Sequence, residues 1–189
     1  MSTGSAYENR RVVENYLTHK LRMTGSASLC ASADDRERVN RALREAGDEL
    51  ERAFRPELME MTKQLFAAPA GAEHRRFVAV ADELFRDGAN WGRVLAFLEF
   101  GALVCARCAP DGERNARAEK VARWMAEYLD GPLSTWILTN GGWEGFADLY
   151  TGQQDSVCRS SWSSLTTSVF SLAALGAVGL TLGAYLAQK

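Results

Sequence analysis

The sequence has 189 residues, of which 47% are hydrophobic and 24% charged, and its formal net charge is −2. A chain of this length can bury the core of one domain of ordinary size. Because acidic and basic residues nearly balance, the composition excludes the strongly basic surface that is typical of nucleic-acid-binding proteins. The first twenty residues contain no apolar run, so we expect no secretory signal peptide.

Residues 90–109 form a nearly continuous apolar stretch in which only Arg93, Glu99 and Arg107 are charged. A helix that packs one face on a core shows a single apolar stripe, whereas this stretch is apolar on almost every side. We therefore predict a central helix that other helices surround. Asn90 is its expected N-cap, and Pro110-Asp111-Gly112 marks its end.

Apolar residues recur at helical spacing in the rest of the first 150 residues. They predict helices at 7–23, 35–54, 57–66, 73–85, 113–129, 133–139 and 143–150. Pro56 is expected to break the chain between the second and third of these helices. Gly47 lies inside the second, where Gly costs about 1 kcal/mol relative to Ala and typically permits the close approach of another helix. Asn140-Gly141-Gly142 predicts a left-handed helix stop. The fold class is therefore all-α, a helical bundle over residues 1–155.

Residues 165–187 contain no charged side chain and are mostly apolar. A segment of this length can span about 30 Å of hydrocarbon, so we predict a transmembrane helix preceded by a linker at 156–164. The alternative is a second buried core helix. A single span near the C-terminus would act as a tail anchor, with the helical domain facing the cytosol.

The sequence offers no set of residues typical of catalysis, of a metal site or of a cofactor site, so we expect no enzyme, no bound metal and no cofactor. Cys105 and Cys108 form a C-x-x-C pair, but they lie inside the apolar stretch and not at a helix start, where thiols are activated. We therefore expect them to be buried core residues. A thiol oxidoreductase is the alternative that this pair leaves open.

Four segments resemble the homology motifs of the Bcl-2 family of apoptosis regulators. ELFRDGANWGRVLAFLEFGALVCA at 83–106 resembles the first homology region and WILTNGGWEGFADLY at 136–150 the second. Residues 39–54, with LREAGDEL at 43–50, resemble the third region, and RRVVENYLTHKL at 10–21 the fourth. The C-terminal TLGAYLAQK resembles the membrane anchor of that family. The resemblance implies a bundle with a central hydrophobic helix hairpin and a C-terminal transmembrane helix. The loop between the first two predicted helices, at 24–35, is shorter than the resemblance implies. The source of the sequence could therefore be a host or a virus that acquired the gene.

The resemblance also implies a hydrophobic groove that takes up an amphipathic helix from a partner. Carried over by motif position, the groove residues are Leu50, Phe54, Met61, Val80, Leu84, Asn90, Gly92, Arg93, Ala96, Phe100 and Phe146. Arg93 would pair with an Asp of the partner helix, and Gly92 would let the partner backbone approach. The alternative for Arg93 is an ordinary surface residue whose stem lies along apolar surface.

Similarity to the pro-survival branch implies a protein that sequesters the death-motif helices of pro-apoptotic relatives of the Bim, Bid, Bad, Puma, Bax and Bak types. Its expected location is the outer mitochondrial membrane, with the endoplasmic reticulum and nuclear envelope as further sites. A pore-forming effector of the Bax or Bak type remains the alternative, because the two classes share one fold and function depends on the site.

Overall fold

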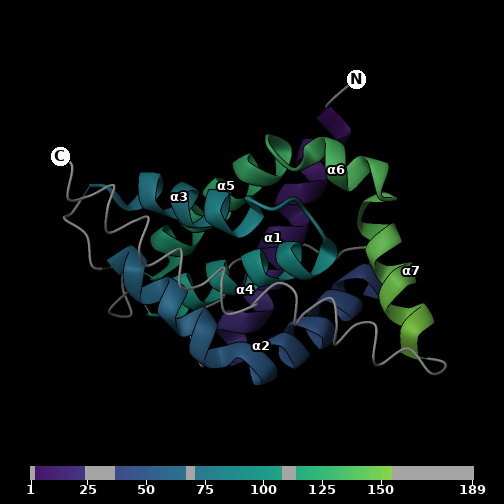
Figure 1. Cartoon of the computed structure of the whole chain (residues 1–189), viewed down its shortest axis with the longest axis horizontal. Coiled ribbons are helices and arrows are strands. Elements are labelled where there is room, and N and C mark those ends of the chain that lie inside the picture. The colour runs from purple at the N-terminus through teal and green to yellow at the C-terminus, as the bar shows by residue number, and fades with distance from the viewer. Residues whose placement is uncertain (1–2, 24–36, 67–70, 108–113, 155–189) are drawn as a thin grey trace.

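The computed structural model describes residues 3–23, 37–66, 71–107 and 114–154, and every regular element in these residues is a helix (Figure 1). The helices are α1 (Thr3–Met23), α2 (Glu37–Phe66), α3 (Glu73–Phe85), α4 (Trp91–Arg107), α5 (Arg114–Asp130), α6 (Ser134–Thr139) and α7 (Gly142–Gln154). The all-α prediction is thus confirmed for the described residues. The linker, the predicted transmembrane segment and Cys108 lie outside them. None of the described helices is long and apolar enough to cross a membrane.

Helix α4 is the central element of the bundle, as its all-round apolar sequence predicts. It packs against α1, α2, α3 and α5, and it lies near the middle of the view in Figure 1. From Trp91 to Ala106 every side chain is buried except Arg93, Leu103 and Ala106, which are half-buried. Cys105 is among the buried residues, in agreement with its expected place in the core.

The predicted break before Pro56 is confirmed, because α2 consists of two helical halves that meet at a kink. Proline lacks an N–H and crowds the preceding turn, so it disturbs the helix upstream of itself. The disturbance falls at Phe54, whose backbone leaves helical geometry at φ −130° and ψ 27°. Leu50 before this kink and Leu58 after it are both buried. Both halves of α2 therefore pack on the core, one on each side of the kink.

The other predicted helices are confirmed to within four residues at each end. The predicted stop at residues 140–142 is also confirmed, since Gly141 and Gly142 have φ of +85° and +63°. Asn9 of α1 joins distant parts of the bundle by donating to Asp130 at 2.7 Å and accepting from the Trp143 indole at 2.8 Å. These bonds fix the first helix against the end of α5 and the start of α7.

Candidate partner-binding site

The eleven groove residues lie on four helices and one short loop. Leu50, Phe54 and Met61 are on α2, Val80 and Leu84 on α3, Gly92, Arg93, Ala96 and Phe100 on α4, and Phe146 on α7, with Asn90 just before α4. Helix α2 packs against α3, α4 and α7. The fold therefore places segments that are far apart in the sequence along α2, with α7 and α3 toward opposite sides of the view in Figure 1.

Most of the apolar groove residues are buried in this structure. Leu50, Met61, Val80, Ala96, Phe100 and Phe146 are each at most 3% exposed, while Phe54 and Leu84 are half-buried against the same core. The Phe100 ring stacks on Phe77 with 5.2 Å between centroids, and Phe146 meets Trp91 edge-on at 5.5 Å. These side chains thus form a closed apolar layer between helices.

Arg93 is the one charged member of the set, and its guanidinium is incompletely paired. The side chain is 11% exposed, and its Nη1 donates to the Gly88 carbonyl oxygen at 2.5 Å. Nη2 lies 3.8 Å from Asp87 Oδ2, which is a distant ion pair. Within the described ranges of the chain, the buried Nε has no hydrogen-bond partner. A guanidinium presents five N–H donors, so Arg93 keeps donors for an additional carboxylate.

Asn90 and Gly92 set the position of this arginine. The Asn90 side-chain oxygen accepts a hydrogen bond from the Arg93 backbone N–H at 2.8 Å, which confirms Asn90 as the N-cap of α4. Gly92, which lies between these two residues in the sequence, is buried. Arg93 therefore projects from the first turn of a capped, mostly buried helix and not from a loop.

A second polar group on α4 has a role that the sequence did not reveal. Glu99 is 1% exposed, and it accepts a hydrogen bond from the Tyr16 hydroxyl at 2.5 Å. Lys20 Nζ lies 2.7 Å from Glu99 and also contacts Asp48 at 2.7 Å and Glu51 at 3.2 Å. We call these five residues the Glu99 cluster. It links α1, α2 and α4, and the charge inside an apolar stretch was the only sequence signal for it, because a buried charge needs a partner.

Burial changes the protonation of this cluster. Loss of solvent raises the pKa of Glu99 to about 7, and the Lys20 ammonium and the Tyr16 hydroxyl offset that rise only in part. Burial lowers the pKa of Lys20, but the carboxylates of Glu99 and Asp48 raise it by more, so its pKa lies above the ordinary value. Lys20 is therefore cationic at neutral pH, whereas Glu99 is close to its titration midpoint.

Gly47 is needed where the Glu99 cluster meets α2. A Cβ at this position would collide with the Tyr16 hydroxyl and lie 2.6 Å from Glu99 Oε1. Its expected role in the close approach of another helix is thus confirmed, and the structure identifies α1 and α4 as the neighbours.

Comparison with known proteins assigns this arrangement to a family. The family model described as "Apoptosis regulator proteins, Bcl-2 family" matches residues 43–143, which include most of α2 and all of α3, α4, α5 and α6. The chain belongs to the Bcl-2 family. Members of this family are regulators of apoptosis.

Curated relatives of the Bcl-2 family align with most of this chain. It is 46% identical to Apoptosis regulator Bcl-2 of Gallus gallus over 151 residues, which are 80% of this chain and 63% of the relative. It is 38% identical to Apoptosis regulator R1 of Xenopus laevis over 192 residues, which cover 96% of this chain and 79% of that protein. Bcl-2-like protein 1 of Rattus norvegicus is 43% identical over 133 residues, 68% of this chain and 56% of the relative. The chain therefore spans less than two thirds of the Gallus gallus relative's length.

The four segments that resemble homology motifs of the Bcl-2 family fall on defined elements of this structure. The fourth region lies on α1, the third on the first half of α2, the first on α3 and α4, and the second on α6 and α7. The Glu99 cluster thus connects the fourth, third and first regions, and Arg93 stands at the start of the helix that carries the first.

Proposed function

We propose that this protein is a pro-survival regulator that binds the amphipathic death-motif helix of pro-apoptotic Bcl-2 family proteins. The partner helix would lie in a groove formed by α2, α3, α4 and α7, with its apolar anchors against the groove residues. Sequestration of that helix would block permeabilisation of the outer mitochondrial membrane. The similarity to Apoptosis regulator Bcl-2 and to Bcl-2-like protein 1 supports the pro-survival direction.

The observation that carries the proposal is the state of Arg93. Among the residues that the structure describes, its buried Nε has no hydrogen-bond partner and its one carboxylate contact is 3.8 Å away. A polar group that loses water without a full set of hydrogen bonds costs free energy, so an incoming carboxylate would be favoured there. An Asp on the polar face of a partner helix would accept hydrogen bonds from the donors of Arg93 that are still unused.

The burial of the apolar groove residues adds a requirement to the proposal. Six of them are at most 3% exposed, so a partner can contact them only after the segments that cover them move aside. The kink at Phe54 divides α2 into two halves, and it offers a point where the second half could shift relative to the first. Binding would therefore combine opening of the layer with docking of the helix.

Residues 165–187 would hold this domain at the outer mitochondrial membrane and related intracellular membranes, facing the cytosol. The absence of charge over the whole segment supports an anchor, because a charged residue at the centre of a membrane helix opposes insertion.

The test uses isolated mitochondria challenged with a death-motif peptide. Addition of the full chain before the peptide should reduce the release of cytochrome c. A pore-forming effector would instead release cytochrome c itself once the peptide is present. Increased release with the chain and the peptide together would therefore overturn the pro-survival assignment.

A further inference from the structure

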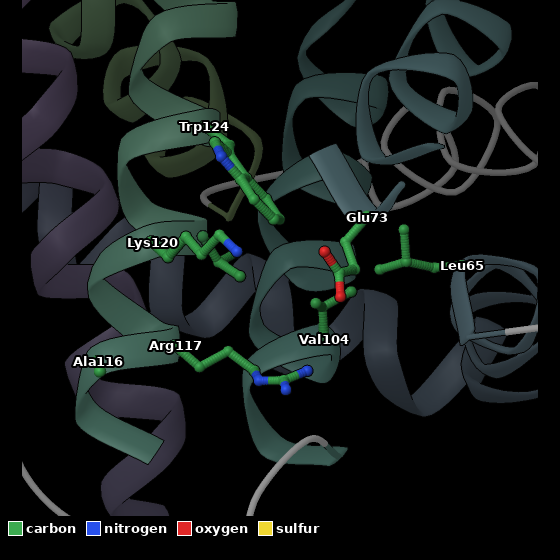
Figure 2. Close-up of a pocket in the computed structure, with 8 residues that line it drawn as sticks. Leu65, Glu73, Val104, Ala116, Arg117, Lys120 and Trp124 are labelled. Carbon is green, nitrogen blue, oxygen red and sulfur yellow. The ribbon is translucent and has the colours of Figure 1, made fainter. Parts of the chain in front are cut away.

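A cavity of about 370 Å³ lies between the end of α2, the start of α3, the end of α4 and the first half of α5 (Figure 2). None of the eleven groove residues lines it, and neither does any member of the Glu99 cluster. Its volume falls in the range of ordinary small-molecule sites. The proposed partner helix does not use this space.

The floor of the cavity is apolar and firmly packed. Leu65, Val104 and Val121 contribute it, and each is at most 2% exposed. Trp124 forms one end, and its ring packs against His74 and Phe77 with centroids 5.2 Å and 5.7 Å apart. A bound molecule would thus meet a rigid surface of aliphatic and aromatic carbon.

The walls of the cavity carry opposite charges. Arg117 and Lys120 stand one turn apart on α5, while Glu73 comes from α3 on the facing wall, as Figure 2 shows. Lys120 Nζ lies 5.2 Å from the Trp124 ring centroid, which holds the ammonium beside the aromatic surface. Within the described part of the chain, neither Arg117 nor Glu73 forms a hydrogen bond or an ion pair. Two cations and one carboxylate therefore face the same space without neutralising each other.

We propose that this cavity binds a small amphipathic zwitterion. The acidic group of the ligand would pair with Arg117 and Lys120, its primary ammonium with Glu73, and its apolar body would cover the Leu65, Val104 and Val121 floor. An alternative role for Glu73 is to stabilise α3, because a carboxylate in the first turn interacts favourably with the helix dipole. That role does not explain why two unpaired cations lie on the opposite wall of the cavity. The shared chemistry fits both a free apolar amino acid and an ethanolamine phospholipid headgroup.

The experiment measures binding to the full chain by saturation-transfer NMR and by titration. L-phenylalanine carries both charges, hydrocinnamate only the acid, and phenethylamine only the amine. Dihexanoyl-phosphatidylethanolamine, below its micelle-forming concentration, represents the lipid headgroup. At least one of the two zwitterions should bind about tenfold more tightly than either singly charged probe, since each lost charge pair would leave a protein charge unmatched. Preference for phenylalanine or for the phospholipid would identify the source of the ligand.

Variants test whether the named charges make the site. Arg117→Gln with Lys120→Gln should weaken zwitterion binding about tenfold, and Glu73→Lys should weaken it while tightening hydrocinnamate. Arg123→Gln is the matched control, because Arg123 is an exposed cation on the same helix that does not line the cavity. A failure of both zwitterions to bind would overturn the proposal. So would equal binding of hydrocinnamate and phenylalanine, or equal effects of the wall and control variants.

Discussion

Lys20 and Glu99 form a buried ion pair with 2.7 Å between Nζ and Oε1, and this pair joins the first helix of the chain to the central one. Their side chains are 9% and 1% exposed. Lys20 also contacts two carboxylates of α2, so a single ammonium holds three helices at one point. Buried ion pairs often stabilise little in total, because desolvation offsets their attraction, but removal of one partner is costly. The Glu99 cluster therefore leads to testable effects on stability.

The first prediction concerns pH. Glu99 has an ordinary pKa of 4.5 and a folded-state pKa of about 7, so the folded protein binds its proton more tightly than the unfolded chain. The contribution of Glu99 to the free energy of unfolding is thus full below pH 4.5 and is lost as the pH rises through 7. The loss amounts to roughly 3.5 kcal/mol at most, from about 1.4 kcal/mol per pKa unit.

Denaturant titrations at about pH 5 and about pH 8 check this contribution. Glu99→Gln should remove this part of the pH dependence, because an amide does not ionise. Glu119→Gln, at an exposed position of α5, should leave the profile of the parent protein intact. An unchanged pH profile in Glu99→Gln would mean that Glu99 is not the titrating group.

The second prediction concerns Gly47. Gly47→Ala should destabilise the fold by about 1–3 kcal/mol, as overpacking of a filled core typically does, because the new Cβ would collide with the Tyr16 hydroxyl. The loss should be smaller in a Tyr16→Phe background, which removes the colliding oxygen. Gly152→Ala in α7 is the control, since a Cβ there meets nothing within 4 Å. Similar losses at Gly47 in both backgrounds would show that Tyr16 is not the obstacle.

The third prediction concerns binding kinetics. Six apolar groove residues are covered, so association with a death-motif peptide should include a step in which the layer opens. The observed rate in stopped-flow fluorescence should level off at high peptide concentration, because opening then limits it. An observed rate that rises linearly to the highest peptide concentration, with an association rate constant above about 10⁶ M⁻¹s⁻¹, would instead indicate a groove that is already open.

The fourth prediction concerns the C-terminal segment. Val178→Arg would place a charge in the middle of the proposed anchor and should cost about 2.5–3.5 kcal/mol of insertion free energy. Fractionation of cells that express the variant should show it shifted from mitochondrial membranes to the cytosol. Val178→Leu keeps the segment apolar and should not change the distribution. Full membrane retention of Val178→Arg would place the anchor elsewhere.

Local sequence patterns predicted most of the described fold. The spacing of apolar residues and the capping of a helix depend on residues that are close in the sequence. The helix positions and the N-cap at Asn90 could therefore be predicted from neighbouring residues. The break before Pro56 could be found in the same way, because proline disturbs the helical turn that precedes it and the kink lies at Phe54. The groove set itself came from resemblance to a family and stays a prediction.

The Glu99 cluster could not be predicted in the same way. Tyr16 and Glu99 are 83 residues apart in the sequence, and only the packing of α1 on α4 brings them together. The sequence marked Glu99 as a charge among apolar residues but held no sign of its partner. The prediction for Gly47 was limited in a similar way. A glycine inside a helix predicted that another helix approaches closely, but the sequence did not show which side chain would be near.

The most direct test of the proposed function is the affinity of Arg93→Ala for a death-motif peptide. Removal of one member of a shielded charge pair typically costs about 2–5 kcal/mol. The variant should therefore bind roughly thirty-fold more weakly or worse, at about 1.4 kcal/mol per factor of ten. Arg41→Ala, at an exposed arginine of α2 outside the groove set, should bind like the parent protein. Circular dichroism should show that both variants keep the helical fold. A large loss confined to Arg93→Ala is the result that we predict, and unchanged affinity in a folded Arg93→Ala protein would contradict the groove as the working site.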